Sequence, residues 1–92
     1  MLEGIQLHSN IHLVYILFSK SLDKFYIGYT SGEMDLRLRR HLTNHHGFTA
    51  KAKDWTVVYT ELHKDKISAL KREKEIKNWK SRIKIEYLIN DL

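Results

Sequence analysis

The stretch Phe25-Tyr26-Ile27-Gly28-Tyr29 determines how the chain around it is interpreted. Tyrosine is a good strand former, and a glycine within a strand marks a bulge or the close approach of another group. Ten residues separate Tyr26 from an earlier tyrosine, Tyr15, which lies in the apolar run His12 to Phe18. Two such runs around a polar segment predict an antiparallel hairpin that brings the tyrosines close together. Because both faces of the first run are apolar, we expect that strand to be covered on both sides.

The residues after the hairpin predict a helix with one basic face. Thr30-Ser31-Gly32-Glu33 has the capping-box pattern, in which a hydroxyl and a glutamate satisfy the first free amides of a helix. The helix should reach about Asn44, with Met34, Leu38 and Leu42 on its buried stripe. The polar stripe beside it holds Arg37, Arg40, His41 and Asn44. Cations are therefore expected next to the hairpin.

The remainder of the chain predicts a loop, a strand and two helices. Asn44 to Asp54 is a basic loop interrupted by glycine, and Trp55 to Leu62 is a third strand. Asp65 is suited to cap a helix that runs through Trp79, and Ser81 to cap a last helix. Near one face of the first of these helices lie Ile67, Leu70, Glu73, Ile76 and Lys77. The last helix carries an apolar stripe of Ile85, Leu88, Ile89 and Leu92.

The pattern therefore gives the order β-β-α-β-α-α. This order indicates an α+β domain, in which a small three-stranded antiparallel sheet is flanked by helices. A chain of 92 residues suffices for one modest core. We expect residues 1–11 to form a lead-in segment and residues 12–92 to form a single domain.

The positive charge of the chain is concentrated in one segment. Leu36 to Lys53 contains five Lys or Arg, three histidines and no acidic residue, whereas the rest balances eleven cations against eleven acids. Such a patch fits a phosphate backbone, although a solvated helix face would have the same composition. No cysteine is present, which excludes disulfides and Cys-based zinc sites. The longest apolar run, the eight residues from Ile11 to Phe18, is too short to span a membrane and no secretory signal pattern is found, so we expect a cytoplasmic protein.

These features resemble the GIY-YIG nuclease family. Leu13-Val14-Tyr15 takes the place of the first tripeptide, with Leu13 where the family has glycine, and Tyr26-Ile27-Gly28 is the second. Three further features are Arg37-Leu38-x-x-His41, a loop around Thr49 and Ala69-x-x-x-Glu73-x-x-Ile76-Lys77-x-Trp79. They are similar to those of small stand-alone bacterial proteins related to the nuclease domain of the excinuclease C subunit. The resemblance covers nearly everything after residue 11 and implies the same fold.

The resemblance implies a metal-dependent DNA endonuclease whose catalytic residues are Tyr15, Tyr26, Arg37, His41 and Glu73. Arg37 would stabilise charge that builds on the phosphoryl oxygens, because a guanidinium donates two hydrogen bonds at once and stays protonated. His41, one turn later, could bind a phosphate oxygen, relay a proton or hold local structure. With His45 it has the spacing of a metal pair, but no Cys or acid nearby completes a zinc shell.

Removing a proton from water requires a base. A free phenol with a pKa near 10 is only about 0.1% ionised at neutral pH, so a tyrosine base must be activated by cations or a metal. We favour Tyr15 as the base and Tyr26 as its orienting hydrogen-bond partner. Strand tyrosines that merely fill a half-buried face are the alternative.

Glu73 is the candidate metal ligand. It shares a helical stripe with Leu70 and Ile76, so its carboxylate should emerge at the border of the core. A confined carboxylate is costly unless it is paired or binds a cation. Mg²⁺ or Mn²⁺ would suit this site, because Mg²⁺ is held by one or two carboxylates, several waters and substrate phosphate. A structural salt bridge to Arg37 or Lys77 is the alternative.

Seven further residues are expected to approach the DNA. Gly28 would let backbone or phosphate come close. The others would supply charge or hydrogen bonds: Arg40, His46, Thr49, Lys51, Lys53 and Lys77. No part of the chain resembles a separate sequence-reading module, so DNA shape or a protein partner would set specificity, and the family resemblance points to repair or recombination. A non-catalytic nucleic-acid-binding domain and a protein-interaction domain remain compatible with the sequence.

Overall fold

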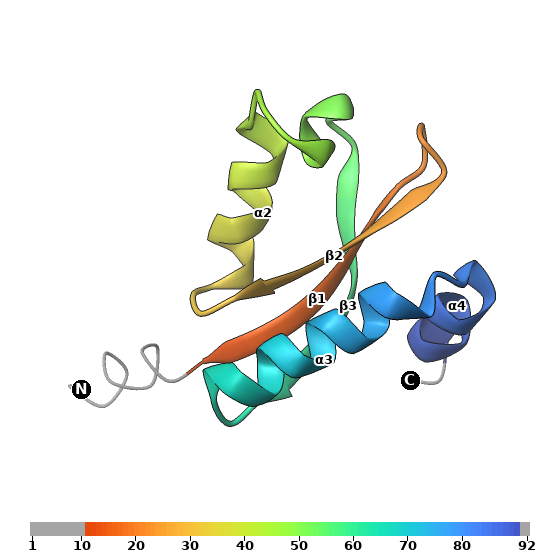
Figure 1. Ribbon diagram of the computed structural model, residues 1–92. Coiled ribbons are helices and arrows are strands. Elements are labelled where there is room, and N and C mark those ends of the chain that lie inside the picture. The colour runs from red at the N-terminus through yellow and green to blue at the C-terminus, as the bar shows by residue number, and fades with distance from the viewer. Residues whose placement is uncertain (1–10, 91–92) are drawn as a thin grey trace.

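The computed structural model describes residues 11–90 (Figure 1). The predicted lead-in therefore lies outside the described residues apart from Ile11, as does Leu92 of the last apolar stripe. The elements are β1 (His12–Ser19), β2 (Lys24–Thr30), α2 (Met34–Thr43), the 3₁₀ helix η1 (Phe48–Lys51), β3 (Trp55–His63), α3 (Lys66–Trp79) and α4 (Arg82–Asn90). The predicted α+β order is confirmed, and η1 is an addition within the predicted basic loop.

The strands form an antiparallel sheet in the order β2-β1-β3, with β1 at its centre. Tyr15 lies opposite Gly28 in the ladder between β1 and β2, and Leu17 lies opposite Tyr26. Tyr15 and Tyr26 are therefore diagonal neighbours. Their ring centroids are 6.4 Å apart, which confirms the predicted proximity.

A bulge in β3 changes which of its side chains face each side of the sheet. The register skips one residue of β3 between the pairs Ile16–Tyr59 and Leu17–Val57. As a result Trp55 joins the core on one side of the sheet and Tyr59 joins the core on the other, although both have odd numbers.

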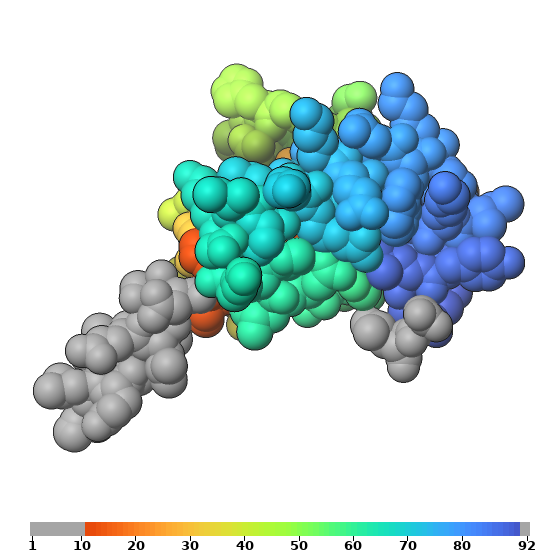
Figure 2. Space-filling model, turned by 60° about the horizontal axis from the view of Figure 1, so that its bottom comes forward, coloured from red at the N-terminus to blue at the C-terminus, as the bar shows by residue number. Residues whose placement is uncertain are grey.

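Helices pack on both sides of the sheet, so β1 is buried on both faces (Figure 1). On one side, α2 and η1 cover a cluster that contains Tyr15, Leu17, Ala52 and Trp55. On the other side, α3 and α4 cover a cluster of Val14, Ile16, Tyr59, Ala69, Ile76 and Ile85. Figure 2 shows α3 extended over this second side, with α4 at its C-terminal end. No helix within residues 11–90 is long and apolar enough to cross a membrane.

Two predicted helix caps are confirmed. Asp65 Oδ1 accepts a hydrogen bond from Ser68 N at 2.8 Å at the start of α3. Ser81 Oγ accepts one from Lys84 N at 3.3 Å at the start of α4. In both cases a side chain close in sequence satisfies an otherwise free amide.

The predicted capping box at Thr30 is wrong. Thr30 remains in β2, where it pairs with Leu13, and its hydroxyl accepts a hydrogen bond from Gly32 N at 3.1 Å. Helix α2 begins only at Met34, with Glu33 in the N-cap position. Strand pairing thus extends β2 through the residue that the local pattern assigned to the helix start.

The buried face of α3 also differs from the prediction. Ala69 and Ile76 are fully buried, whereas Ile67 and Leu70 are 73% and 39% exposed. The small side chain of Ala69 lets the helix approach the sheet closely. Arg72, on the same face, is drawn to Glu61 of β3, which rotates Ile67 and Leu70 towards solvent.

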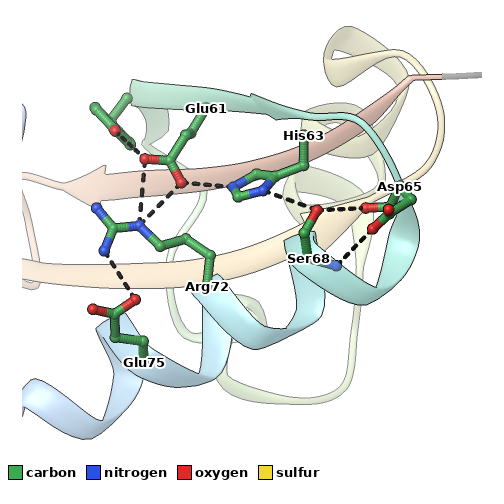
Figure 3. A network of polar contacts seen from close by, with 7 residues as sticks. Glu61, His63, Asp65, Ser68, Arg72 and Glu75 are labelled. Carbon is green, nitrogen blue, oxygen red and sulfur yellow. Dashed lines mark hydrogen bonds and ion pairs between the residues drawn. The ribbon is translucent and has the colours of Figure 1, made fainter.

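A polar network fixes α3 against β3 (Figure 3). Glu61 accepts hydrogen bonds from Arg72 Nε at 3.0 Å and from Tyr59 Oη at 2.8 Å, and its Oε1 lies 2.7 Å from His63 Nε2. Arg72 also forms an ion pair with Glu75 at 3.0 Å. Arg72 is the residue before the candidate metal ligand, so the network holds this part of α3 against β3.

Glu61 should make the stability of the fold depend on acidic pH. Partial burial opposes ionisation of Glu61, but hydrogen bonds from His63, Tyr59 and Arg72 outweigh it and lower the pKa below 4.5. A lowered folded-state pKa stabilises the fold above the unfolded-state pKa, and this contribution is lost as the pH falls towards the folded-state value. In urea unfolding, Glu61→Gln should cost about 1–2 kcal/mol at pH 7 and progressively less below about pH 4.5. An equal cost at pH 7 and pH 3 would contradict this assignment.

Candidate active site

The hydroxyl of Tyr15 on β1 is the centre of the candidate site. Arg37 of α2 donates a hydrogen bond from Nε to Tyr15 Oη at 3.0 Å. His41 Nε2, one turn further along α2, lies 2.7 Å from the same oxygen. On the opposite side of the imidazole ring, Nδ1 lies 3.0 Å from Thr49 Oγ1 in η1. Four residues from three elements therefore form one chain of hydrogen bonds.

Chemistry fixes the direction of one of the two bonds at Tyr15. A guanidinium can only donate, so Tyr15 Oη accepts from Arg37, whereas the direction of its bond with His41 Nε2 depends on the tautomer of the imidazole. Burial raises the pKa of the Tyr15 phenol, although the hydrogen bond and the charge of Arg37 act in the opposite direction. Burial, followed by the charge of Arg37, lowers the pKa of His41 below 6.5, which keeps the ring neutral at pH 7.

Gly28 makes room for this phenol. Tyr15 is completely buried and lies directly opposite Gly28. A Cβ atom at residue 28 would overlap Cζ and Oη of Tyr15 and lie 2.9 Å from its Cε1. The sequence analysis placed backbone or phosphate against Gly28. The structure corrects this, because the group that approaches Gly28 is the phenol.

Arg37 is anchored through its Nε alone. The hydrogen bond to Tyr15 is the largest influence on Arg37 and raises the pKa of the guanidinium. Among residues 11–90, no partner is bonded to Nη1 or Nη2, and neither nitrogen is buried without a partner. The two terminal nitrogens are therefore accessible to an anion, which a guanidinium binds with two parallel hydrogen bonds.

Tyr26 lies in different surroundings from Tyr15. It is partly exposed, its ring packs edge-on against His41 at 5.0 Å, and it stacks on Phe48 at 6.2 Å. Its hydroxyl has no bonded partner within the described chain and is not buried, so it faces solvent. The prediction that Tyr26 orients Tyr15 by a hydrogen bond is wrong. The two rings are diagonal neighbours with centroids 6.4 Å apart, but their hydroxyls are not bonded to each other. Arg37 and His41 bond to the Tyr15 hydroxyl and orient it instead.

Glu73 lies at the border of the core, with its side chain 18% exposed. The alternative salt bridge is present, because Lys77 Nζ lies 3.1 Å from Glu73 Oε2. The charge of Glu73 nevertheless reaches the tyrosine site. Burial is the main cause that raises the pKa of Tyr15, and the carboxylate of Glu73 adds to it. Residues 11–90 contain no group of three or more His, Cys, Asp or Glu that could hold a metal ion by themselves.

Two residues predicted at the surface are buried. His41 was placed on the polar stripe of α2, and Thr49 was expected to touch substrate phosphates, but they are only 6% and 3% exposed. Thr49 is held in place because Trp55 Nε1 donates to its carbonyl oxygen at 2.9 Å. Thr49 therefore contacts His41 in the interior of the domain, and the burial of Thr49 excludes a direct contact with phosphate. Sequence reasoning did not predict that Trp55 fixes Thr49, because a tryptophan at the start of a strand does not indicate which carbonyl oxygen its indole will bond.

The other residues predicted to contact DNA remain at the surface. Arg40 and Arg37 together line two adjoining hollows of about 390 and 240 Å³. Lys53 Nζ donates to the carbonyl oxygen of Asn44 at the end of α2. Lys51 lies over the ring of Phe48, 5.0 Å from its centroid. His46 and Lys77 are also exposed, Lys77 in its ion pair with Glu73.

The fold and this site define a small α+β domain in which an arginine with two accessible terminal nitrogens lies beside two strand tyrosines. The family model described as the GIY-YIG catalytic domain matches residues 11–86. The chain therefore belongs to the GIY-YIG family of nucleases, as its motifs indicated. Searches of curated proteins and of solved structures found no match.

Adding a methyl group at Gly28 should destabilise the protein. Its Cβ would overlap the Tyr15 phenol, which is held on two sides by Arg37 and His41. Overpacking of this kind costs about 1–3 kcal/mol, which urea unfolding of Gly28→Ala would measure. Gly32→Ala is the matched control, since its Cβ would meet only Thr30 Oγ1 at 3.9 Å. Equal stability of the two variants would show that Tyr15 has more room than its packing implies.

Proposed function

We propose that this protein is a metal-dependent endonuclease that cuts DNA by hydrolysis of a phosphodiester bond. The observation that carries this proposal is the anchoring of Arg37. Its Nε is bonded to a buried phenol, its two terminal nitrogens are left for an anion, and the free hydroxyl of Tyr26 belongs to the same site. A small neutral ligand would not need this arrangement, whereas a phosphate diester would.

Arg37 is the residue that we assign to the phosphoryl group. In hydrolysis, the oxygen of water forms a bond to phosphorus while the bond to the leaving sugar oxygen breaks, and negative charge builds on the other phosphoryl oxygens. A preorganised donor at that position stabilises the transition state more than the ground state. The bond to Tyr15 supplies this preorganisation, because it fixes the guanidinium before substrate arrives. Arg40, in the same hollows, adds a second cation for the DNA backbone.

Tyr26 is the tyrosine that we assign to the attacking water. Exposure supports this assignment, because the Tyr26 hydroxyl faces solvent while the Tyr15 hydroxyl is covered and bonded on two sides. A group that takes a proton from water must come within hydrogen-bond reach of it. Tyr15 then acts through Arg37 and His41, which it positions. This reverses the roles that the sequence suggested for the two tyrosines.

Glu73 is the residue that would hold the metal ion. Its confined carboxylate fits Mg²⁺ or Mn²⁺, since one protein carboxylate, waters and substrate phosphate can complete such a shell. A bound divalent ion would polarise a phosphoryl oxygen and favour ionisation of water. The ammonium group of Lys77, which now neutralises Glu73, is half exposed and can move into solvent when another cation binds.

The basic segment from Leu36 to Lys53 supports binding without sequence readout. Its exposed cations Arg40, Lys51 and Lys53 suit phosphates rather than base edges, and His46 is exposed in the same segment. We therefore propose that specificity comes from DNA shape or from a protein partner. Action in repair or recombination and a cytoplasmic location complete the proposal, and both rest on the family resemblance and on the sequence.

The test is cleavage of supercoiled, linear, branched and single-stranded DNA with Mg²⁺ or Mn²⁺. Wild type should cut with metal and not with EDTA, and Glu73→Gln should lose about 100-fold or more in rate. Glu86→Gln on α4 is the control, because it makes the same charge change in an exposed ion pair outside the site. All variants must show the wild-type unfolding transition.

Other outcomes would select other functions. Salt-dependent DNA binding that is indifferent to metal and to Glu73→Gln, with no cleavage, would mean a non-catalytic nucleic-acid-binding domain. No DNA binding even at low salt would favour a protein-interaction domain.

Replacing each motif tyrosine by phenylalanine should separate their roles. Tyr26→Phe should keep its stability and lose about 10²- to 10⁴-fold in cleavage rate, as expected when a group that handles a proton is removed. Tyr15→Phe should also lose stability, by about 1–3 kcal/mol, because Arg37 Nε and His41 Nε2 are left without their partner. An active Tyr26→Phe beside a folded but inactive Tyr15→Phe would instead make Tyr15 the base.

A further inference from the structure

Thr49 is the buried end of the hydrogen-bond chain that holds Arg37. Its Oγ1 lies 3.0 Å from His41 Nδ1, and both residues are almost completely buried. The hydrogen bond from Trp55 Nε1 to the Thr49 carbonyl fixes the backbone at this point. A polar contact this enclosed has no water to replace either partner, so Thr49 pairs with His41 Nδ1 whichever ring nitrogen carries the hydrogen.

A neutral His41 has two possible arrangements. With hydrogen on Nδ1, the ring donates to Thr49 and accepts from the Tyr15 hydroxyl, so every bond from Arg37 to Thr49 has a donor and an acceptor. With hydrogen on Nε2, both Arg37 and His41 donate to Tyr15 Oη, and the phenolic hydrogen is left without an acceptor in a fully buried position. In the first arrangement the hydrogen left unpaired is that of the Thr49 hydroxyl. A phenol is a stronger donor than this aliphatic hydroxyl, so an unpaired hydrogen costs more on Tyr15 than on Thr49. The first arrangement is therefore favoured.

We propose that His41 carries its hydrogen on Nδ1, as the Tyr15 hydroxyl requires, and that Thr49 is the positioning residue that accepts this hydrogen. In that tautomer the Tyr15 hydroxyl donates to His41 and its oxygen accepts from Arg37 Nε. Thr49 thus supports the orientation of the guanidinium through two intervening side chains. The consequence for cleavage rests on the proposed function, whereas the tautomer itself does not.

The groups around His41 support a neutral ring. Arg37 lies one turn earlier on the same helix, Tyr15 faces the ring from β1, Tyr26 from β2 and the uncharged Thr49 from η1. Arg37 is the charged group among them, and it disfavours a second positive charge on His41. The tautomer can therefore be selected without protonation of the ring at pH 7.

The first test is ¹⁵N NMR of the full chain at pH 7, which distinguishes the two imidazole tautomers without any substrate. His41 should show hydrogen on Nδ1 in wild type and in Thr49→Ser, which keeps the hydroxyl. Tyr15→Phe removes the donor that the Nδ1 tautomer satisfies and should shift the ring towards the Nε2 tautomer. Tyr29→Phe removes a hydroxyl of β2 that bonds to His12 and serves as the matched control. An Nε2 tautomer in wild type, or no shift in folded Tyr15→Phe, would overturn the proposal; if Tyr15→Phe fails to fold, wild type and Thr49→Ser still decide it.

The second test is the cleavage rate. Thr49→Val should reduce kcat by about tenfold or more with little change in KM, because the orientation of Arg37 matters most in the transition state. Thr49→Ser should restore most of the lost rate. An unchanged kcat in folded Thr49→Val would overturn the positioning role. If wild type does not cleave DNA at all, the proposed function fails, and the NMR result alone then decides the tautomer.

Discussion

The hydrogen bond from Arg37 Nε to the buried hydroxyl of Tyr15 is the contact on which the rest of the site depends. Tyr15 belongs to the central strand and is covered on all sides, so it is among the most firmly held side chains of the molecule. An arginine fixed to such a group needs little reorganisation to receive an anion. The same contact requires Gly28, because any larger residue there would displace the phenol.

The need for space opposite Tyr15 applies to residue 28 and not to residue 13, which explains why Leu13 can stand where the first motif of the family has glycine. Leu13 pairs with Thr30 on one side and Leu62 on the other, two residues away from the phenol. A side chain there does not compete for the space that the Tyr15 ring uses. The motif glycine on which the packing of Tyr15 depends in this chain is therefore Gly28.

Much of the architecture could be predicted because it depends on local pattern. The apolar run His12 to Phe18 required a strand buried on both faces, and Asp65 and Ser81 mark helix starts through bonds to amides three residues away. The predictions failed where distant partners decide the outcome. Thr30 carried a local helix signal that pairing with β1 overrode, and Leu70 was turned outwards by the attraction between Arg72 and β3.

The site followed the same rule. Its members could be named from the sequence, since Tyr15, Tyr26 and Arg37 follow from motif spacing. The roles that we propose for the two tyrosines could not, because they rest on exposure, and exposure depends on the packing of α2 and η1. The bond between His41 and Thr49 joins residues that a helix end and a loop separate in the chain, and no periodicity links them.

The bulge in β3 gives the protein an uneven tolerance to changes in chain length during evolution. Because the register skips one residue there, Trp55 and Glu61 of the same strand lie on opposite sides of the sheet. Trp55 bonds to Thr49 of η1 on one side, and Glu61 bonds to Arg72 of α3 on the other. The skipped residue is Val58, and without it the pairs Ile16–Tyr59 and Leu17–Val57 would follow one another in a regular ladder, so Trp55 and Glu61 would keep their faces. A deletion between Trp55 and Val57 would instead turn Trp55 to the other face, away from η1. Homologous chains should therefore vary in length at the bulge and at exposed turns such as the one around Gly32, and less within the paired parts of β3.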